Sequence, residues 1–248
     1  MKLTIVGSGD AFGSGGRGNT CFWLETAKAT LLVDCGASAP PALKGLHLDP
    51  NRIDAIVLSH LHGDHFGGLP FLLIDGQHLA RREKPLLIAG PPGTRDRLNA
   101  ALEVFFPKST ETKWRFDWSV EEIAVGAETQ VLGHSLVTAE VIHKSGAPST
   151  ALRLGDGEKT FAYSGDTAWT EALLPIARDA DLFICECYAY EGTKISGHMS
   201  WEILKAKRDA LAARQLMVTH MNPTVLARLD EIEAAGVLVA ADGLIVDF

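Results

Sequence analysis

The sequence predicts an α/β fold in which two β-sheets carry helices on their outer faces. Short apolar runs bounded by turn residues recur in both halves of the chain, and a few stretches with helical spacing lie between them. The length of 248 residues and the apolar content of 46% are typical of a globular chain with a large core. We therefore expect residues 1–248 to form one domain.

Each predicted strand is a short apolar run that ends in turn residues. Three helices are predicted from apolar residues at helical spacing: residues 94–105, residues 200–213 with Ser200 as N-cap, and residues 224–235 ending at Gly236. Strands are predicted over residues 3–6, 21–25, 30–34, 55–58, 86–89, 130–132, 137–142, 150–154, 160–163, 182–185, 215–219, 237–240 and 244–246.

Charge and apolar patterning exclude several classes of protein. The 23 basic and 31 acidic residues give a net charge of −8, which disfavours extensive nucleic-acid binding. Neither a membrane-spanning run nor a secretory signal is evident, so we expect a cytoplasmic protein without membrane association. The four cysteines lie within apolar runs and are predicted to be small core residues: Cys21, Cys35, Cys185 and Cys187.

The strongest chemical signal is the run His60-Leu61-His62-Gly63-Asp64-His65, which follows the predicted strand over residues 55–58. Imidazole nitrogens and carboxylate oxygens are the donors that zinc and related ions prefer. Four such side chains in six residues cannot easily bind one ion together. The spacing therefore predicts two adjacent metal ions.

Further ligand-type residues follow predicted strands downstream. His143 ends the run Val141-Ile-His143, Asp166 follows residues 160–163, and His220 follows residues 215–219. Together with the first cluster they supply enough donors for a two-metal site, in which Asp166 could bridge two cations.

These motifs resemble the metallo-β-lactamase superfamily, and their order most resembles ribonuclease Z-like phosphodiesterases. The resemblance covers nearly the whole chain. It is carried by Gly7-Ser-Gly-Asp10-Ala-Phe-Gly, Asn19-Thr20, Leu32-Val-Asp34-Cys-Gly36, His60 to His65 with Gly67-Gly68-Leu69-Pro70, Gly90-Pro91, Ser164-Gly-Asp166-Thr, Glu186-Cys-Tyr, Gly197-His198-Met-Ser and Thr219-His220.

The resemblance implies a four-layer αββα sandwich with two divalent metal ions in a cleft at one edge of the sheets. Zinc is the expected metal, with manganese or iron as alternatives because N and O donors accept all three. A homodimer is expected by the same analogy. The implied ligands are His60, His62 and His143 for one metal, Asp64, His65 and His220 for the other, and Asp166 as the bridge.

The mechanism expected of such a site is hydrolysis by a metal-bridging hydroxide, because two cations lower the pKa of a shared water. Asp64 would orient this nucleophile or take its proton. His198 matches a family histidine implicated in the phosphodiesterase branch and would contact a phosphoryl oxygen or protonate the leaving group. Glu186 is the candidate to orient His198.

The sequence departs from the transfer-RNA-processing members in one respect. Residues 66–142 contain no long Gly/Pro-rich arm, which favours a small or medium anionic ester as substrate. Thioesterase, lactamase and sulfatase activities of the same fold stay open, as does a metal-binding module without turnover. A redox di-iron centre is disfavoured, since that branch usually replaces a first-cluster histidine with a carboxylate and His62 is retained.

Overall fold

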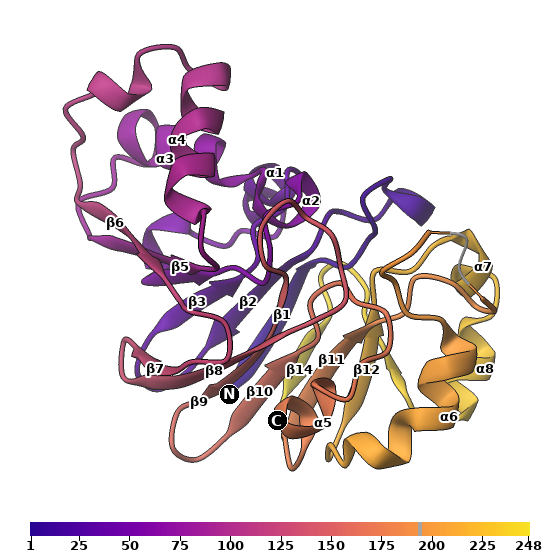
Figure 1. Ribbon diagram of the computed structural model, residues 1–248. Helices are drawn as coiled ribbons and strands as arrows, with labels where there is room; N and C mark the ends of the chain where they lie inside the picture. The colour runs from indigo at the N-terminus through magenta and orange to yellow at the C-terminus, as the bar shows by residue number, and fades with distance from the viewer. Residues whose placement is uncertain (193–194) are drawn as a thin grey trace.

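Two seven-stranded β-sheets face each other and helices cover their outer faces (Figure 1). The computed structural model describes residues 1–192 and 195–248. The strand order is β14-β1-β2-β3-β4-β5-β6 in the first sheet and β13-β12-β11-β10-β9-β8-β7 in the second. The four layers confirm the predicted αββα sandwich.

The first sheet is antiparallel from β14 through β3 and parallel from β3 through β6. Its parallel half directs the carboxyl ends of β3, β4 and β5 to one edge. Its strands are β1 (Lys2–Gly7), β2 (Cys21–Glu25), β3 (Thr30–Val33), β4 (Ala55–Val57), β5 (Leu86–Gly90), β6 (Trp118–Glu122) and β14 (Ile245–Asp247).

The second sheet is antiparallel from β7 through β10 and parallel from β10 through β13. The carboxyl ends of β10, β11 and β12 therefore lie at a common edge. Its strands are β7 (Glu128–Val131), β8 (His134–Glu140), β9 (Thr150–Gly155), β10 (Thr160–Tyr163), β11 (Leu182–Glu186), β12 (Leu216–Thr219) and β13 (Leu238–Val239).

The helices connect these strands and supply the outer layers (Figure 1). The first half of the chain contains α1 (Ala39–Gly45), α2 (Gly63–Phe66), α3 (Leu69–His78) and α4 (Thr94–Phe105), with the 3-10 turns η1 (Ser14–Gly16), η2 (Pro50–Arg52) and η3 (Ser109–Glu111). The second half contains α5 (Leu173–Ala177), α6 (Trp201–Leu211), α7 (Pro223–Leu226) and α8 (Leu229–Ala234). None of the described helices combines the length and the apolarity that crossing a membrane requires.

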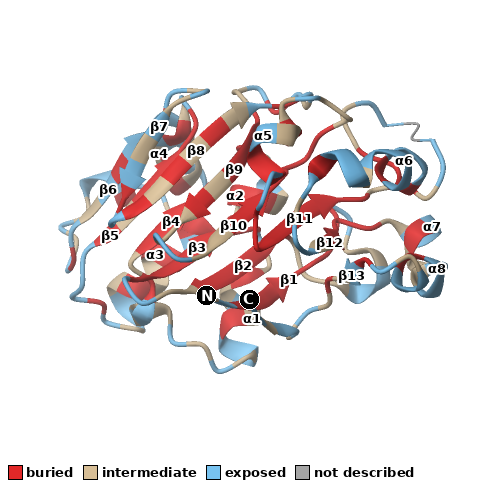
Figure 2. Cartoon of the chain, turned by 90° about the horizontal axis from the view of Figure 1, so that it is seen from below, coloured by how far each residue is buried: buried red, intermediate tan, exposed pale blue. Residues whose placement is uncertain are grey.

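The apolar core lies in three layers, one between the sheets and one beneath each set of helices. Between the sheets, the ring of Phe22 packs edge-on against Phe161 and Tyr163, with centroid separations of 6.5 and 5.2 Å. Figure 2 shows the central strands buried and the outward helix faces exposed. All four cysteines are buried and unpaired, as predicted. Burial of this apolar area stabilises both sheets and so fixes the position of the loops that carry the polar residues described below.

Four helices and one strand were not predicted by the sequence patterns, namely α1, α2, α3, α5 and β6. The predicted helix over residues 224–235 is instead two helices, because Arg228 takes a non-helical backbone with φ −139° and ψ 32°. Leu132, predicted to end a strand, lies in a turn with φ 48°. The N-cap prediction for α6 is confirmed, since the Ser200 side chain accepts a hydrogen bond from the Ile203 amide.

Candidate metal centre

Loops that leave strands of both sheets converge at one edge of the sandwich. They follow β4 and β8, and also β10 and β12, so they bring together residues up to 160 positions apart. All seven predicted ligands gather there in two neighbouring groups, within each of which one donor atom per residue lies within 4.8 Å of the others. The first group is His60, His62 and His143, and the second group is Asp64, His65, Asp166 and His220.

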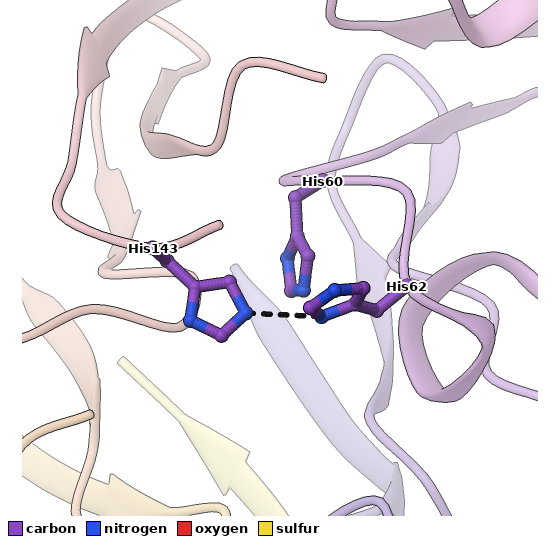
Figure 3. Close-up of side chains that lie close together, drawn as sticks. All are labelled: His60, His62 and His143. Atoms are coloured by element: carbon purple, nitrogen blue, oxygen red, sulfur yellow. Dashed lines mark hydrogen bonds between the residues drawn. The ribbon is translucent and has the colours of Figure 1, made fainter. Parts of the chain in front are cut away.

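The first group consists of three imidazoles whose rings point toward one another (Figure 3). The His60 ring centroid lies 5.0 Å from that of His62 and 4.9 Å from that of His143. His62 Nδ1 and His143 Nε2 are 3.0 Å apart. Burial lowers the pKa of His60 well below its ordinary value and also lowers the pKa of His143, so both rings favour the neutral form that binds metals.

The second group is more deeply buried and combines two carboxylates with two imidazoles. His65 Nε2 lies 3.3 Å from Asp64 Oδ2 and 3.3 Å from Asp166 Oδ1, and His220 Nε2 lies 3.3 Å from Asp166 Oδ2. Asp166 Oδ2 is also 3.9 Å from His60 Nε2. Asp166 therefore faces both groups.

The electrostatics of the second group favour a positive charge inside it. Burial alone raises the pKa of Asp166, but the neighbouring His220 and His65 bring it well below its ordinary value. Burial opposes protonation of His65, yet the charges of Asp166 and Asp64 raise its pKa well above its ordinary value. For Asp64 too, the effect of His65 outweighs burial and lowers the pKa.

Several donor atoms of the two groups have no hydrogen-bond partner among the described residues. His60 Nε2, His65 Nε2 and Asp166 Oδ1 are all buried in this state. Buried polar atoms without a partner are costly and rare in folded proteins. Imidazole nitrogens and carboxylate oxygens that converge in this way fit two adjacent divalent cations by their donor chemistry.

Asp34, at the end of β3, orients one imidazole of the second group. Its buried carboxylate accepts hydrogen bonds from His65 Nδ1 at 2.7 Å, from the Ser59 amide at 2.8 Å and from Ser59 Oγ at 2.7 Å. Fixing Nδ1 in this way turns His65 Nε2 toward the other ligands. The motif around Asp34 was noted in the sequence, but this role was missed, because only the folded structure places it against His65.

The predicted His198–Glu186 pair is present beside both groups. His198 Nδ1 lies 3.2 Å from Glu186 Oε1 and 3.1 Å from Oε2, and its ring stacks on His220 with centroids 5.5 Å apart. Burial raises the pKa of Glu186 to about 7. The Tyr188 ring lies against the His198 ring, with centroids 4.7 Å apart. No role was predicted for Tyr188 from the sequence.

The fold and the donor cluster together define a metallo-hydrolase of the metallo-β-lactamase fold, in its ribonuclease Z-like branch. The probable metallo-hydrolase YhfI of Bacillus subtilis is 30% identical over 231 residues, covering 89% of this chain and 87% of that protein. Its crystal structure superposes with a TM-score of 0.76 at 26% identity, over 99% of this chain and 98% of that one. The ribonuclease Z of Ignicoccus hospitalis is 28% identical over 89% of this chain and 88% of its own length.

A match to a family model places the chain more narrowly within this class. The family model described as Anti-Pycsar protein Apyc1 matches residues 1–239, and the chain belongs to that family. The Anti-Pycsar protein Apyc1 of Bacillus phage vB_BsuM-Goe3 is 33% identical over 188 residues, covering 71% of each chain.

Proposed function

We propose that the protein is a binuclear metal-dependent phosphodiesterase that acts on a small or medium anionic ester. The observation that carries this proposal is the pair of donor groups that share Asp166 next to His198 and Glu186. The seven residues of the two groups would hold two divalent cations, with zinc as the expected metal. When bound, such cations activate water and neutralise charge on a phosphoryl group.

Asp64 is the residue proposed to handle the proton of the attacking water. Its Oδ2 faces His65, which leaves the other carboxylate oxygen for the water. The neighbouring His65 outweighs the effect of burial and keeps the pKa of Asp64 low, so the carboxylate is ionised and ready to accept a hydrogen bond.

His198 is the residue proposed to act on the leaving-group side. Glu186 occupies its Nδ1, which leaves Nε2 to donate to a phosphoryl oxygen or to protonate the leaving oxygen. Burial disfavours the protonated ring, but the hydrogen bond and charge of Glu186 raise the pKa of His198 above its ordinary value. Glu186 therefore favours the protonated ring that this role needs.

The substrate class is tested with chromogenic phosphodiester, thioester, lactam and sulfate substrates offered to the metal-loaded protein. We expect turnover of the phosphodiester, and we expect Asp64→Ala to abolish it. Asp75→Ala is the matched control, because Asp75 pairs with Lys44 between α3 and α1 and has no part in the donor groups. Good turnover of another class without phosphodiester cleavage would contradict the proposal, and inactivity toward all classes would favour the binding module.

A biological role follows from the family membership as a second candidate. Because its phage relative bears the name anti-Pycsar protein, we propose that this chain also acts against Pycsar. Cells that carry Pycsar would lose its effect when they express the wild-type chain and keep it when they express Asp64→Ala. Equal behaviour of the two would contradict this role.

We also propose that the protein is cytoplasmic and forms a homodimer. Light scattering on the purified protein tests the dimer.

A further inference from the structure

The imidazoles of the first group come from loops of different sheets. His60 and His62 lie on the loop after β4 of the first sheet, whereas His143 lies on the loop after β8 of the second (Figure 3). The distance of 3.0 Å between His62 Nδ1 and His143 Nε2 is therefore set by how the two loops meet.

The side chain of Arg97 on α4 joins these two loops. Its Nη1 donates to the Leu61 carbonyl at 3.0 Å and to the Ser145 carbonyl at 2.9 Å, and its Nη2 lies 3.5 Å from the Gly146 carbonyl oxygen. Leu61 stands between His60 and His62, and Ser145 follows His143 by two residues. One guanidinium thus holds the backbone beside all three imidazoles.

On the strength of the metal centre proposed above, we propose that Arg97 is a positioning residue that sets the geometry of the first group. Both carbonyls accept from one nitrogen, Nη1, whose two N–H bonds lie in the rigid plane of the guanidinium. The separation of the two carbonyls is therefore fixed. No carboxylate among the described residues forms an ion pair with Arg97, so these carbonyls receive its charge-assisted hydrogen bonds.

The loop around His143 is shaped to receive the guanidinium. Gly146 has a φ of +73°, a conformation that L side chains rarely adopt, and a Cβ there would meet Arg97 Nη2 at 3.1 Å. Ser145 is buried and its Oγ donates to the Ala147 carbonyl at 2.9 Å, which holds the turn closed.

Other hydrogen bonds fix each loop separately. His143 Nδ1 lies 2.8 Å from the Gly197 carbonyl oxygen, and the preceding Ile142 amide donates to Thr167 Oγ1 at 3.1 Å. The Ser59 carbonyl accepts hydrogen bonds from Thr150 N at 3.0 Å and Thr150 Oγ1 at 2.8 Å, which fixes the start of the first loop before His60. In the second group, Asp34 supports His65 directly through the hydrogen bond with Nδ1, and within the described part of the chain Arg97 has no hydrogen bond to that residue. Loss of Arg97 is therefore expected to weaken the first group and spare the second.

The test is a Co²⁺ titration of metal-depleted protein, followed by visible absorption with a competing chelator. The wild type is expected to bind two equivalents. In Arg97→Ala, one equivalent is expected to bind about 10–100-fold more weakly while the other keeps its affinity. His62→Ala identifies the first-group equivalent, so the spectrum lost in the two variants is expected to match.

Arg95→Ala is the matched control, because Arg95 lies on the same helix and donates to the Val120 carbonyl on β6, away from both loops. It is expected to bind both equivalents like the wild type. Arg97→Lys keeps the charge but loses the planar guanidinium whose Nη1 binds both carbonyls. A weaker first-group equivalent is expected in this variant too, which decides the matter if Arg97→Ala does not fold.

Unchanged binding of both equivalents by the Arg97 variants would overturn the inference, as would equal weakening of both equivalents or the same loss in Arg95→Ala. No substrate is involved. A protein that shows the expected binding pattern and does not cleave phosphodiesters would contradict the proposed function alone.

Discussion

The two donor groups differ in charge and in exposure although they share one edge of the sandwich. The first group offers three imidazoles, and of these only His60 is fully buried. The second offers two carboxylates and two imidazoles, nearly all buried, with the Asp34 carboxylate behind them. A cation in the second group would neutralise charges that the protein interior tolerates poorly, so we expect tighter binding there. Because His62 and His143 of the first group are only partly buried, we expect the substrate to approach from that side.

Asp166→Ala is the change that breaks this comparison most completely, because Asp166 faces both groups. We expect loss of both cations and of detectable turnover. At a metal concentration ~1,000 times Kd, each bound cation stabilises the wild type by roughly 4 kcal/mol, and this variant is expected to lose the stabilisation from both. Calorimetry with and without a chelator measures it.

Asp75→Ala is expected to keep the metal-dependent stabilisation, since its partner is Lys44. An Asp166→Ala variant that still gained stability from metal would show that Asp166 does not link the groups.

His198→Ala separates catalysis from metal binding. We expect turnover to fall by about 10²–10⁴-fold, the usual contribution of a proton donor, while the metal content stays at two. The loss is expected to be larger for esters with poor leaving groups if His198 protonates the leaving oxygen, and uniform if it contacts a phosphoryl oxygen. Turnover and metal content are measured on the same preparation.

Loss of a cation from His198→Ala would contradict this assignment. Such a loss would indicate that His198 is itself a metal ligand. One donor atom each of His198, His143 and Asp166 lie within 4.8 Å of one another, which is close enough for that role. Glu186→Gln is the companion variant, expected to slow turnover less because the imidazole remains.

Asp34→Asn tests whether the hydrogen bond behind His65 supports cation binding by the second group. The carboxylate accepts three hydrogen bonds from His65 and Ser59, and an amide nitrogen would oppose one of these donors. Asn tolerates the φ of 57° at this position, so the fold is expected to persist. Cation affinity of the second group is expected to fall about 10–100-fold, as measured by metal titration. Weakening of the first group alone would contradict this role.

The candidate ligands could be predicted from sequence because they either follow a strand closely or belong to the dense run from His60 to His65. His60, Asp166 and His220 stand one to three residues beyond β4, β10 and β12, and polar residues that end neighbouring strands meet at one edge. Their convergence into two groups depends on how the two sheets face each other. The assignment of residues to each group came from the family resemblance and not from the spacing.

Supporting residues were not predictable in the same way. Asp34 acts through hydrogen bonds with His65 and Ser59, which lie on another segment of the chain. Arg97 acts through backbone carbonyls that carry no sequence signal. The break between α7 and α8 at Arg228 has neither glycine nor proline to mark it, and the Arg228 guanidinium packs over the Tyr190 ring at 4.3 Å. Tertiary contacts determine such features.

The most direct measurement is anomalous X-ray scattering from crystals of the metal-loaded protein, recorded at the absorption edge of the bound metal. We expect two peaks, one among His60, His62 and His143 and one among Asp64, His65 and His220, with Asp166 between them. No peak at this edge of the sandwich, or a single peak held by residues outside both groups, would contradict the account.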